Sequence, residues 1–213
     1  MSQGSSAQPE RQEAEMIFHE HLRTTAAAFV QTASEAAGVV ADMAEALIAT
    51  LRAGGKVMLC GNGGSAAQAQ HLAAEFVGRY LRERQPLPAI ALTTDSSALT
   101  AIGNDYRFDE VFSRQIDALA VEGDVLIALS TSGTSGNVVL AAQTARAKNV
   151  TVLAFTGQSG GELAKHADLA LQVPSVDAPI VQEIHLAVGH VLCDLVERAL
   201  IAAPETFGMG RLV

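Results

Sequence analysis

The stretch Ser130-Thr131-Ser132-Gly133-Thr134-Ser135-Gly136-Asn137 decides the fold, because it joins two different kinds of element. An apolar run at 125–129 precedes it, and a helical pattern at 137–148 follows it. A strand-to-helix junction rich in hydroxyl groups and glycines can bind an anion. The anion is held by backbone N–H groups, by the N-terminus of the helix and by uncharged hydroxyl donors. The stretch therefore predicts a phosphate-binding loop; an ordinary Gly/Ser turn is the alternative.

A second tract of the same kind, Cys60-Gly61-Asn62-Gly63-Gly64-Ser65, follows the apolar run at 57–59. Two strand–(Gly/Ser)–helix units in one chain predict two walls of one pocket for an anionic ligand. Neither tract matches the phosphate loop that ends in Lys-Ser/Thr, and neither is a GxGxxG placed for a dinucleotide. A nucleotide cofactor is therefore not indicated.

The rest of the chain alternates between strand and helix patterns. Strands are expected at 56–60, 89–93, 124–130, 151–156 and 169–173, and helices at 65–80, 96–102, 108–120, 137–148 and 179–201. Strands rich in Val, Ile and Leu without polar alternation are typical of a parallel sheet covered on both faces. We therefore expect an α/β fold, a three-layer α-β-α sandwich around five parallel strands. Ligands of such sheets bind beyond the carboxyl ends of the strands, where both tracts lie.

The ends of the chain complete this domain prediction. Two further helices are expected near 13–32 and 35–53. Residues 1–12 are polar and rich in Gly, Ser and Gln, which predicts a disordered tail. Residues 13–213 are expected to form a single domain that includes the N-terminal helical pair.

Composition excludes several classes of protein. The 213 residues carry a net charge of −9, which argues against a nucleic-acid surface but not against a phosphorylated substrate. No run of about 18 apolar residues indicates a membrane span. The two cysteines, Cys60 and Cys193, have no metal-binding or redox spacing and are typical of a reducing compartment. A cytoplasmic protein without membrane or nucleic-acid partners is expected.

The helix at 179–201 has a broad apolar face, formed by Ile184, Val188, Val191, Leu192, Leu195 and Val196. The N-terminal helical pair is also rich in Ala, Val and Leu. Five strands are too few to cover all these helices, so contacts between subunits are predicted.

Four polar residues are candidates for chemistry. His71 and Glu75 share a helical face at i, i+4, which suits a metal half-site, an acid/base pair or a plain surface hydrogen bond. His190 lies in an apolar helix, where it is either functional or a core or interface histidine with a partner. Asp105 follows Gly103-Asn104 and is either part of a turn or a polar contact in the pocket.

These residues carry a family resemblance that covers about residues 40–200. The chain resembles the phosphosedoheptulose isomerases of the sugar isomerase (SIS) domain superfamily. The matching motifs are Cys60–Ser65, Gln70-His71-Leu-Ala-Ala-Glu75, Gly78-Arg79-Tyr80, Pro88–Leu92, Ala101–Tyr106, Val111–Gln115, Gly123–Leu126, Ser130–Gly133, Val173-Pro174-Ser175 and Gln182-Glu183-Ile184-His185 through to His190. The Ser/Thr loop identifies only the superfamily, whereas the His71/Glu75 and Gln182/His190 pairs indicate the isomerase branch.

The resemblance implies isomerisation of D-sedoheptulose 7-phosphate to D-glycero-D-manno-heptose 7-phosphate, the first step of bacterial heptose synthesis for the cell envelope. It implies an acid/base pair, Glu75 and His190, and one zinc ion per site held by His71, Glu75, Gln182 and His190. It implies a homotetramer. The substrate-binding residues that it implies, with Ser65 added for its position at a helix start, are Asn62, Gly63, Gly64, Ser65, Glu75, Asn104, Asp105, Ser130, Thr131, Ser132, Ser135 and Gln182.

One geometric difficulty accompanies this ligand set. Gln182 and His190 lie about 12 Å apart along the axis if 179–201 is one continuous helix. Both residues can then bind one ion only if the regular helix begins after Gln182, or if the site combines residues from two subunits. We expect a site shared between two subunits. Mixed tetramers of Glu75→Gln and His190→Gln subunits are accordingly predicted to recover activity. His185 lies about 140° around the helix from His190 and is expected to be structural or an interface residue.

Two other functions stay open at this point. A non-catalytic SIS-domain tetramer that binds the bacterial replication initiator shares the Ser/Gly framework, but we expect that branch to lack the counterparts of Glu75 and His190. Another sugar-phosphate isomerase or a sugar-phosphate sensor is the second alternative, because phosphate contacts do not measure the length of the sugar chain.

Overall fold

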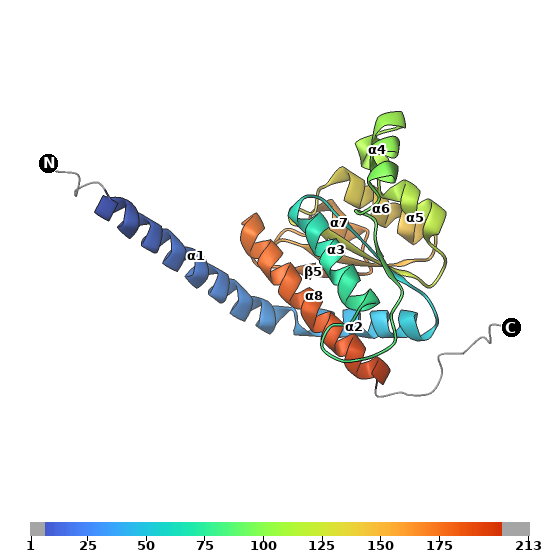
Figure 1. The fold of residues 1–213 in the computed structure, drawn as a ribbon, viewed down its shortest axis with the longest axis horizontal. Helices are drawn as coiled ribbons and strands as arrows, with labels where there is room; N and C mark the ends of the chain where they lie inside the picture. Colours follow the sequence, from blue (N-terminus) through green and yellow to red (C-terminus); the bar gives the residue numbers. More distant parts are fainter. Residues whose placement is uncertain (1–6, 202–213) are drawn as a thin grey trace.

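The computed structural model describes residues 7–201, with side chains over residues 10–201. Five parallel strands form one sheet in the order β2-β1-β3-β4-β5 (Figure 1). Their bounds are β1 Val57–Gly61, β2 Ala89–Ala91, β3 Val125–Ser130, β4 Thr151–Thr156 and β5 Leu169–Gln172. The helices are α1 Ala7–Glu35, α2 Ala37–Arg52, α3 Gly64–Val77, α4 Ser96–Asp105, α5 Ser113–Leu119, α6 Gly136–Ala147, α7 Gly161–Lys165 and α8 Ala178–Ile201, with a 3₁₀ turn at Phe108–Glu110.

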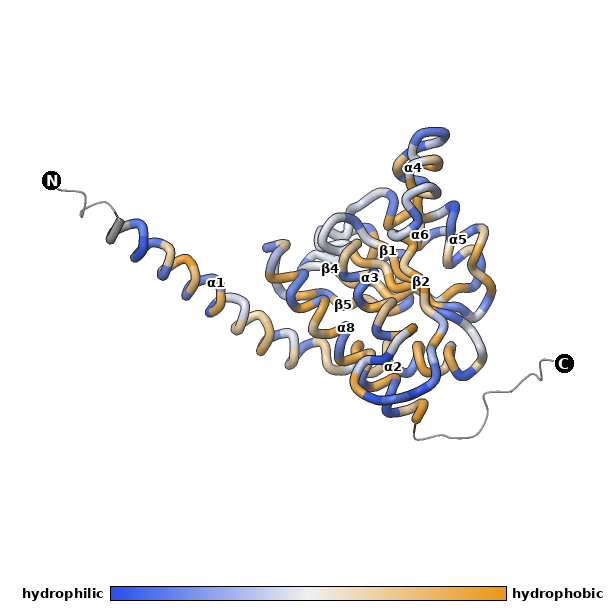
Figure 2. Tube along the Cα trace, viewed as in Figure 1, coloured by the Kyte–Doolittle hydropathy of each residue, from blue (hydrophilic) through white to orange (hydrophobic). Residues whose placement is uncertain are grey.

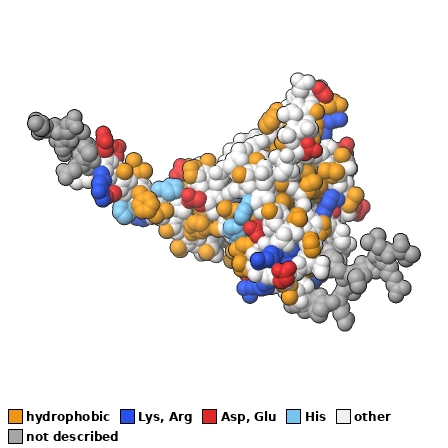
Figure 3. Space-filling view, in the orientation of Figure 1, with side chains coloured by type: hydrophobic (Ala, Val, Ile, Leu, Met, Phe, Trp, Pro, Cys, Tyr) orange, Lys and Arg blue, Asp and Glu red, His pale blue; other side chains and the backbone are white. Residues whose placement is uncertain are grey.

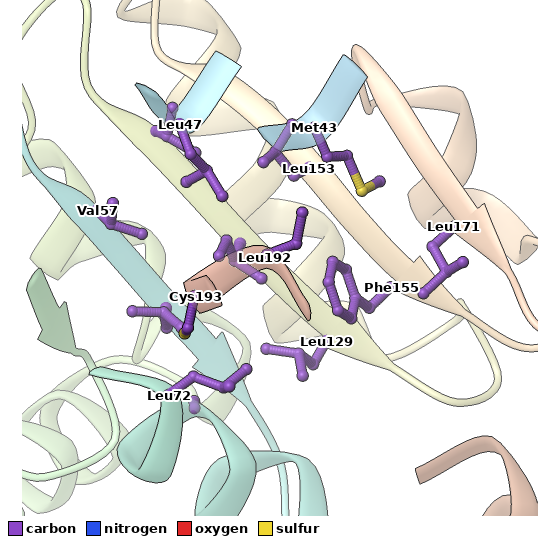
Figure 4. Packing of buried hydrophobic residues seen from close by; sticks show 14 of the residues in the cluster. Met43, Leu47, Val57, Leu72, Leu129, Leu153, Phe155, Leu171, Leu192 and Cys193 are labelled. Carbon is purple, nitrogen blue, oxygen red and sulfur yellow. The ribbon is translucent and has the colours of Figure 1, made fainter. Parts of the chain in front are cut away.

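Helices cover both faces of the sheet, so the predicted three-layer α-β-α sandwich is confirmed. Every residue of β1 and β3 is buried, and successive side chains enter opposite clusters. Val57 and Leu59 pack with α2, α3 and α8, whereas Met58 and Cys60 pack with α5 and α6. Figure 4 shows the first cluster, in which Leu72 of α3 and Leu192 of α8 meet the strand residues. Figure 2 shows the same apolar centre along the backbone.

The expected elements are confirmed with small shifts of their ends. The helix predicted at 108–120 is divided into the 3₁₀ turn and α5, and α4 is three residues longer than predicted, ending at Asp105. The sequence patterns did not indicate α7, a five-residue helix.

The predicted tail at 1–12 is wrong over residues 7–12. Helix α1 already begins at Ala7 and extends away from the sandwich (Figure 1). Ion pairs at helical spacing, such as Arg11 with Glu15 at 3.0 Å, offset the polarity of this part of the chain. Residues 1–6 and 202–213 lie outside the described residues, and the single-domain prediction for 13–213 stays a prediction. Among residues 7–201, no helix is long and apolar enough to cross a membrane.

His185 belongs to the core, which agrees with the structural role predicted for it. The residue is fully buried against the ring of Phe155. Its Nε2–H donates to the carbonyl of Thr156 at 3.1 Å, and its Nδ1 is buried without a partner among the described residues. Burial lowers the pKa of His185 from 6.5 to about 4, although the Thr156 carbonyl favours the charged form.

This lowered pKa predicts an acid-sensitive fold. Between pH 6.5 and 4 the unfolded chain holds a proton at His185 that the folded chain does not, so stability falls as pH falls through this window. The expected loss from this group between pH 7 and pH 5 is about 2 kcal/mol. Urea unfolding at both pH values measures it. The control is His185→Gln, which keeps a donor for Thr156 but does not titrate; an equal pH slope in wild type and variant contradicts the prediction.

Candidate active site

The Ser130–Ser135 loop joins β3 to α6 and is folded on its own hydroxyl groups. The Ser130 and Ser135 hydroxyls lie 3.0 Å apart, and Ser132 Oγ accepts from both the amide and the hydroxyl of Thr134. Ser135 precedes the first residue of α6, whose opening amides have no partners within the helix. Hydroxyl groups and helix amides thus converge at the carboxyl edge of the sheet, as a phosphate requires.

Gly133 holds this loop against the loop that follows β4. Its φ of +67° lies in the left-handed region, and a Cβ there would overlap the backbone of Gly160 and Gly161. The Gly133 carbonyl also accepts from the amide of Leu163 at 2.8 Å. The close approach of these two backbones leaves no room for a side chain.

Gly133→Ala is therefore expected to destabilise the fold by about 2 kcal/mol or more and to raise KM for a phosphorylated substrate, because the loop must move. Chemical denaturation and steady-state kinetics measure the two effects. Gly38→Ala is the matched control, since a Cβ at Gly38, within helix α2, meets nothing within 4 Å. Equal free energies of unfolding for Gly133→Ala and wild type would contradict the prediction, because the loop would then accommodate the side chain without cost.

The Asn62 loop is tied directly to the Ser/Thr loop. β1 and β3 are neighbours in the sheet, and Gly61 is in register with Leu129. Beyond the strands, Asn62 and Asn137 exchange two amide hydrogen bonds, each 2.8 Å long. The two tracts are therefore adjacent, and the pocket predicted between them stays a prediction. Asn137 was not among the predicted site residues, and its position at the end of the quoted stretch is the one signal that points to it.

The side chain of Gln182, a residue of α8, lies against Gly64, the first residue of α3. A Cβ on Gly64 would come within 2.6 Å of both Nε2 and Oε1 of Gln182, so this side chain covers the glycine. The Gln182 carbonyl accepts from Gln68 at 2.6 Å, which fixes the first turn of α8 against α3. The predicted substrate-binding residues Asn62, Gly64 and Gln182 are therefore brought together within one chain. Ser65, the second residue of α3, is buried.

Two turns further along α3, three ionisable side chains face one another. His71 Nε2 lies 2.9 Å from His190 Nε2 of α8 and 3.4 Å from Glu75 Oε1. One ligand atom from each of the three residues lies within 4.8 Å of the others. The i, i+4 pair is thus part of a cluster with His190. The three donors suit a metal ion, and a carboxylate between imidazoles also suits proton transfer.

Within one chain, the Gln182 side chain lies against Gly64, about two turns of α3 before His71. Helix α8 is continuous from Ala178 to Ile201, so the separation expected between Gln182 and His190 applies. Glu75 and His190, in contrast, come from the same chain. The predicted recovery of activity on mixing Glu75→Gln with His190→Gln subunits is therefore corrected: such mixtures contain no site with both groups from one chain.

No hydrogen bond joins Asn104 or Asp105 to the two loops in the described part of the chain. They end α4, a helix without buried residues that projects from the sandwich (Figure 1). The Asn104 amide donates to the Asp105 carboxylate at 2.8 Å, and both residues are exposed. A substrate-binding role for them stays a prediction.

Comparisons with known proteins identify the family of this chain. Residues 20–157 match the model of the SIS domain family. The phosphoheptose isomerase of Rhodospirillum rubrum is 57% identical over 180 residues, which is 81% of this chain and 96% of that protein. That of Pelobacter propionicus is 52% identical over 181 residues, covering 85% of this chain and 96% of its own length.

Solved structures give the same result. Phosphoheptose isomerase from Neisseria gonorrhoeae superposes with a TM-score of 0.83 at 41% identity, covering 87% of this chain and 99% of that one. The enzyme from Francisella tularensis gives a TM-score of 0.84 at 37% identity, with 87% and 98% coverage. The shared fold, the extent of identity and the His71–Glu75–His190 cluster place the chain in the phosphoheptose isomerase family of SIS-domain proteins.

Proposed function

We propose that this protein converts D-sedoheptulose 7-phosphate to D-glycero-D-manno-heptose 7-phosphate, an aldose–ketose isomerisation. The observation that carries the proposal is the His71–Glu75–His190 cluster, whose first two residues lie on the helix that follows one of two adjacent loops rich in Gly, Ser and Asn. The names of the relatives agree with a heptose phosphate as substrate. The reaction supplies heptose for the bacterial cell envelope.

The chemistry requires one base on carbon and one proton carrier on oxygen. Glu75 takes a proton from C1 of the ketose, which leaves an enediol, and returns a proton to C2. His190 moves a proton from the C1 hydroxyl to the C2 oxygen, so the carbonyl ends at C1. The reaction neither gains nor loses atoms, and each group returns to its starting state.

The phosphate end gives the substrate its position. Ser130, Thr131, Ser132 and Ser135 hold the phosphate with hydroxyls and with amides of the α6 N-terminus. Asn62, Gly63, Gly64 and Gln182 border the path from there to the cluster. Binding energy from the unreactive phosphate thus fixes the distant C1 and C2 atoms against Glu75.

We propose zinc as the metal of the cluster. A carboxylate or imidazole bound to zinc cannot move a proton at the same moment, so in this proposal substrate would partly displace Glu75 and His190 from the metal. Two imidazoles and one carboxylate are a donor set that zinc accepts in catalytic sites, and His71, Glu75 and His190 bring these donors together. When bound, zinc would polarise the carbonyl oxygen and stabilise negative charge on the enediolate. Gln182 of another subunit is the fourth ligand in this proposal.

Metal removal tests the zinc proposal. Dialysis against a chelator is expected to lower kcat by about 10²-fold or more, because the charge on the enediolate loses its stabilisation. Activity is expected to return with Zn²⁺ and not with Mg²⁺, which prefers oxygen ligands. Full activity of protein shown by elemental analysis to lack metal would contradict the proposal.

We infer a homotetramer with sites at subunit interfaces. Helix α1 carries exposed apolar side chains along its length (Figure 3): Met16, Ile17, Phe18, Leu22, Phe29 and Val30. A solvated monomer rarely leaves such a surface uncovered. A monomer at micromolar concentration in light scattering would contradict the inference. We also place the protein in the cytoplasm, since Cys60 and Cys193 are free, buried thiols.

A coupled assay tests the function directly. Sedoheptulose 7-phosphate and fructose 6-phosphate are compared at equal concentrations, with the aldose products detected by chromatography. The proposal predicts turnover of the heptulose phosphate at a kcat/KM at least about tenfold above that of the hexulose. No turnover of sedoheptulose 7-phosphate would contradict it.

A further inference from the structure

The segment between α3 and β2 is fixed to α8 by a buried carboxylate. Residues 78–88 form neither helix nor strand. Glu197 of α8 is completely buried and accepts three consecutive backbone amides from this segment: Tyr80 at 2.7 Å, Leu81 at 3.0 Å and Arg82 at 3.0 Å. Burial raises the pKa of Glu197, but these amides and the charge of Arg84 outweigh it and hold that pKa below its usual range.

Arg84 extends the same link to the end of α3. Its Nε donates to Glu197 at 3.1 Å, while its other nitrogens donate to the carbonyls of Glu75 at 2.7 Å and Phe76 at 2.9 Å. Carbonyls in the last turn of a helix otherwise lack partners within the helix. We call Glu197 and Arg84 the clamp. It joins the part of α3 that carries Glu75 to the helix that carries His190.

The clamp brings one aromatic ring to the reacting groups. The ring of Tyr80, the first residue held by Glu197, stacks on the imidazole of His190, with centroids 5.3 Å apart and planes at 16°. His71 meets the same imidazole edge-on, at 5.1 Å and 77°. Among the described residues, the Tyr80 hydroxyl has no hydrogen-bond partner, so its contribution comes from the ring.

We propose that Tyr80 is a positioning residue for the isomerisation: its ring, held by the clamp, fixes the plane of the His190 imidazole. The only hydrogen bond to that imidazole in the described chain is the one between its Nε2 and His71, and a single bond at Nε2 does not set the tilt of the ring plane. Stacking on Tyr80 removes this freedom. A proton carrier must keep its nitrogen aligned with the substrate oxygens, because a small displacement of that nitrogen lowers the reaction rate.

The inference rests on the proposed function and is tested with two substitutions at one position. Tyr80→Leu removes the ring and is expected to lower kcat on sedoheptulose 7-phosphate by about tenfold or more. KM is expected to stay within about threefold, because the phosphate-binding loops are untouched. Tyr80→Phe keeps the ring and is expected to retain kcat within about twofold. Leu81→Ala is the matched control, since Leu81 is held by the same carboxylate through its amide while its side chain is exposed.

A spectroscopic readout separates positioning from general damage. Protons of His190 that lie over the Tyr80 ring are shielded, so its ring signals, assigned by their loss in His190→Gln, are expected to move downfield in Tyr80→Leu. They are expected to keep their positions in Tyr80→Phe and Leu81→Ala. Glu197→Gln retains the shape of the clamp without its charge and is expected to move the same signals in the same direction.

The outcomes distinguish this inference from the function on which it rests. An active wild type together with an unchanged kcat in Tyr80→Leu overturns the positioning role alone. Equal losses in Tyr80→Leu and Tyr80→Phe overturn it as well, because the hydroxyl would then be responsible. A wild type that does not turn over sedoheptulose 7-phosphate overturns the proposed function, and unchanged His190 signals in Tyr80→Leu then overturn the stacking.

Discussion

Replacing Glu75 with glutamine is expected to lower kcat on sedoheptulose 7-phosphate by about 10³-fold, because an amide cannot accept the proton from C1. Glu75 faces His71 and His190, is only partly exposed, and is the one carboxylate of this three-residue cluster in the described part of the chain. The amide has the same shape as the carboxylate, and the fold is expected to persist. KM is expected to change little, since the phosphate is bound elsewhere.

Steady-state kinetics and circular dichroism measure this pair of effects. Glu83→Gln is the control, because Glu83 is a highly exposed carboxylate whose ion pair, with Arg79 at 3.6 Å, is on the surface. It removes the same charge from the same part of the chain, and wild-type kinetics are expected. A Glu75→Gln protein that keeps more than a tenth of wild-type kcat would exclude Glu75 as the base.

Gly189→Ala is expected to lower kcat by about 10²-fold and to destabilise the fold by about 1–3 kcal/mol. Gly189 precedes His190, and a Cβ there would lie 2.6 Å from Leu72 Cδ2 and 2.7 Å from Cδ1. Leu72 follows His71 and is buried in the core cluster between α3, α8 and the sheet (Figure 4). The added methyl group must therefore push α8 away from α3 and separate the two histidines.

A double-mutant cycle isolates this steric cause. Leu72→Ala alone leaves a cavity and is expected to cost about 2–5 kcal/mol. Combined with Gly189→Ala, it provides room for the new methyl group, so the double variant is expected to be more stable than the sum of the single changes predicts. Strict additivity in urea unfolding, with kcat unchanged in Gly189→Ala, would contradict close packing as the cause.

The strands and helices of the sandwich could be predicted from local sequence patterns, whereas the structure of residues 7–12 could not. The apolar runs that became β1 and β3 contain no polar alternation, and burial on both faces explains why they could be identified. Residues 7–12 are polar and resemble a tail, but side-chain pairs at helical spacing, such as Arg11 with Glu15, run along α1. The five residues of α7 are too few for a periodic pattern.

The site could be predicted from sequence only where neighbours in the chain act together. The hydroxyl-rich loop and the i, i+4 spacing of His71 and Glu75 were visible, but spacing alone left three readings open. The partner that distinguishes them, His190, is 119 residues from His71 in the chain. Tyr80 and Gly189 make contacts between distant elements, so no local pattern indicates their roles.

The reaction run in D₂O tests the central claim most directly, that Glu75 isomerises sedoheptulose 7-phosphate through an enediol. A proton that passes through a carboxylate exchanges with solvent, whereas a hydride that moves directly from C1 to C2 does not. Proton NMR of the product is expected to show D-glycero-D-manno-heptose 7-phosphate with deuterium at C2. No heptose product, or a product that retains hydrogen at C2 in full, would contradict the account.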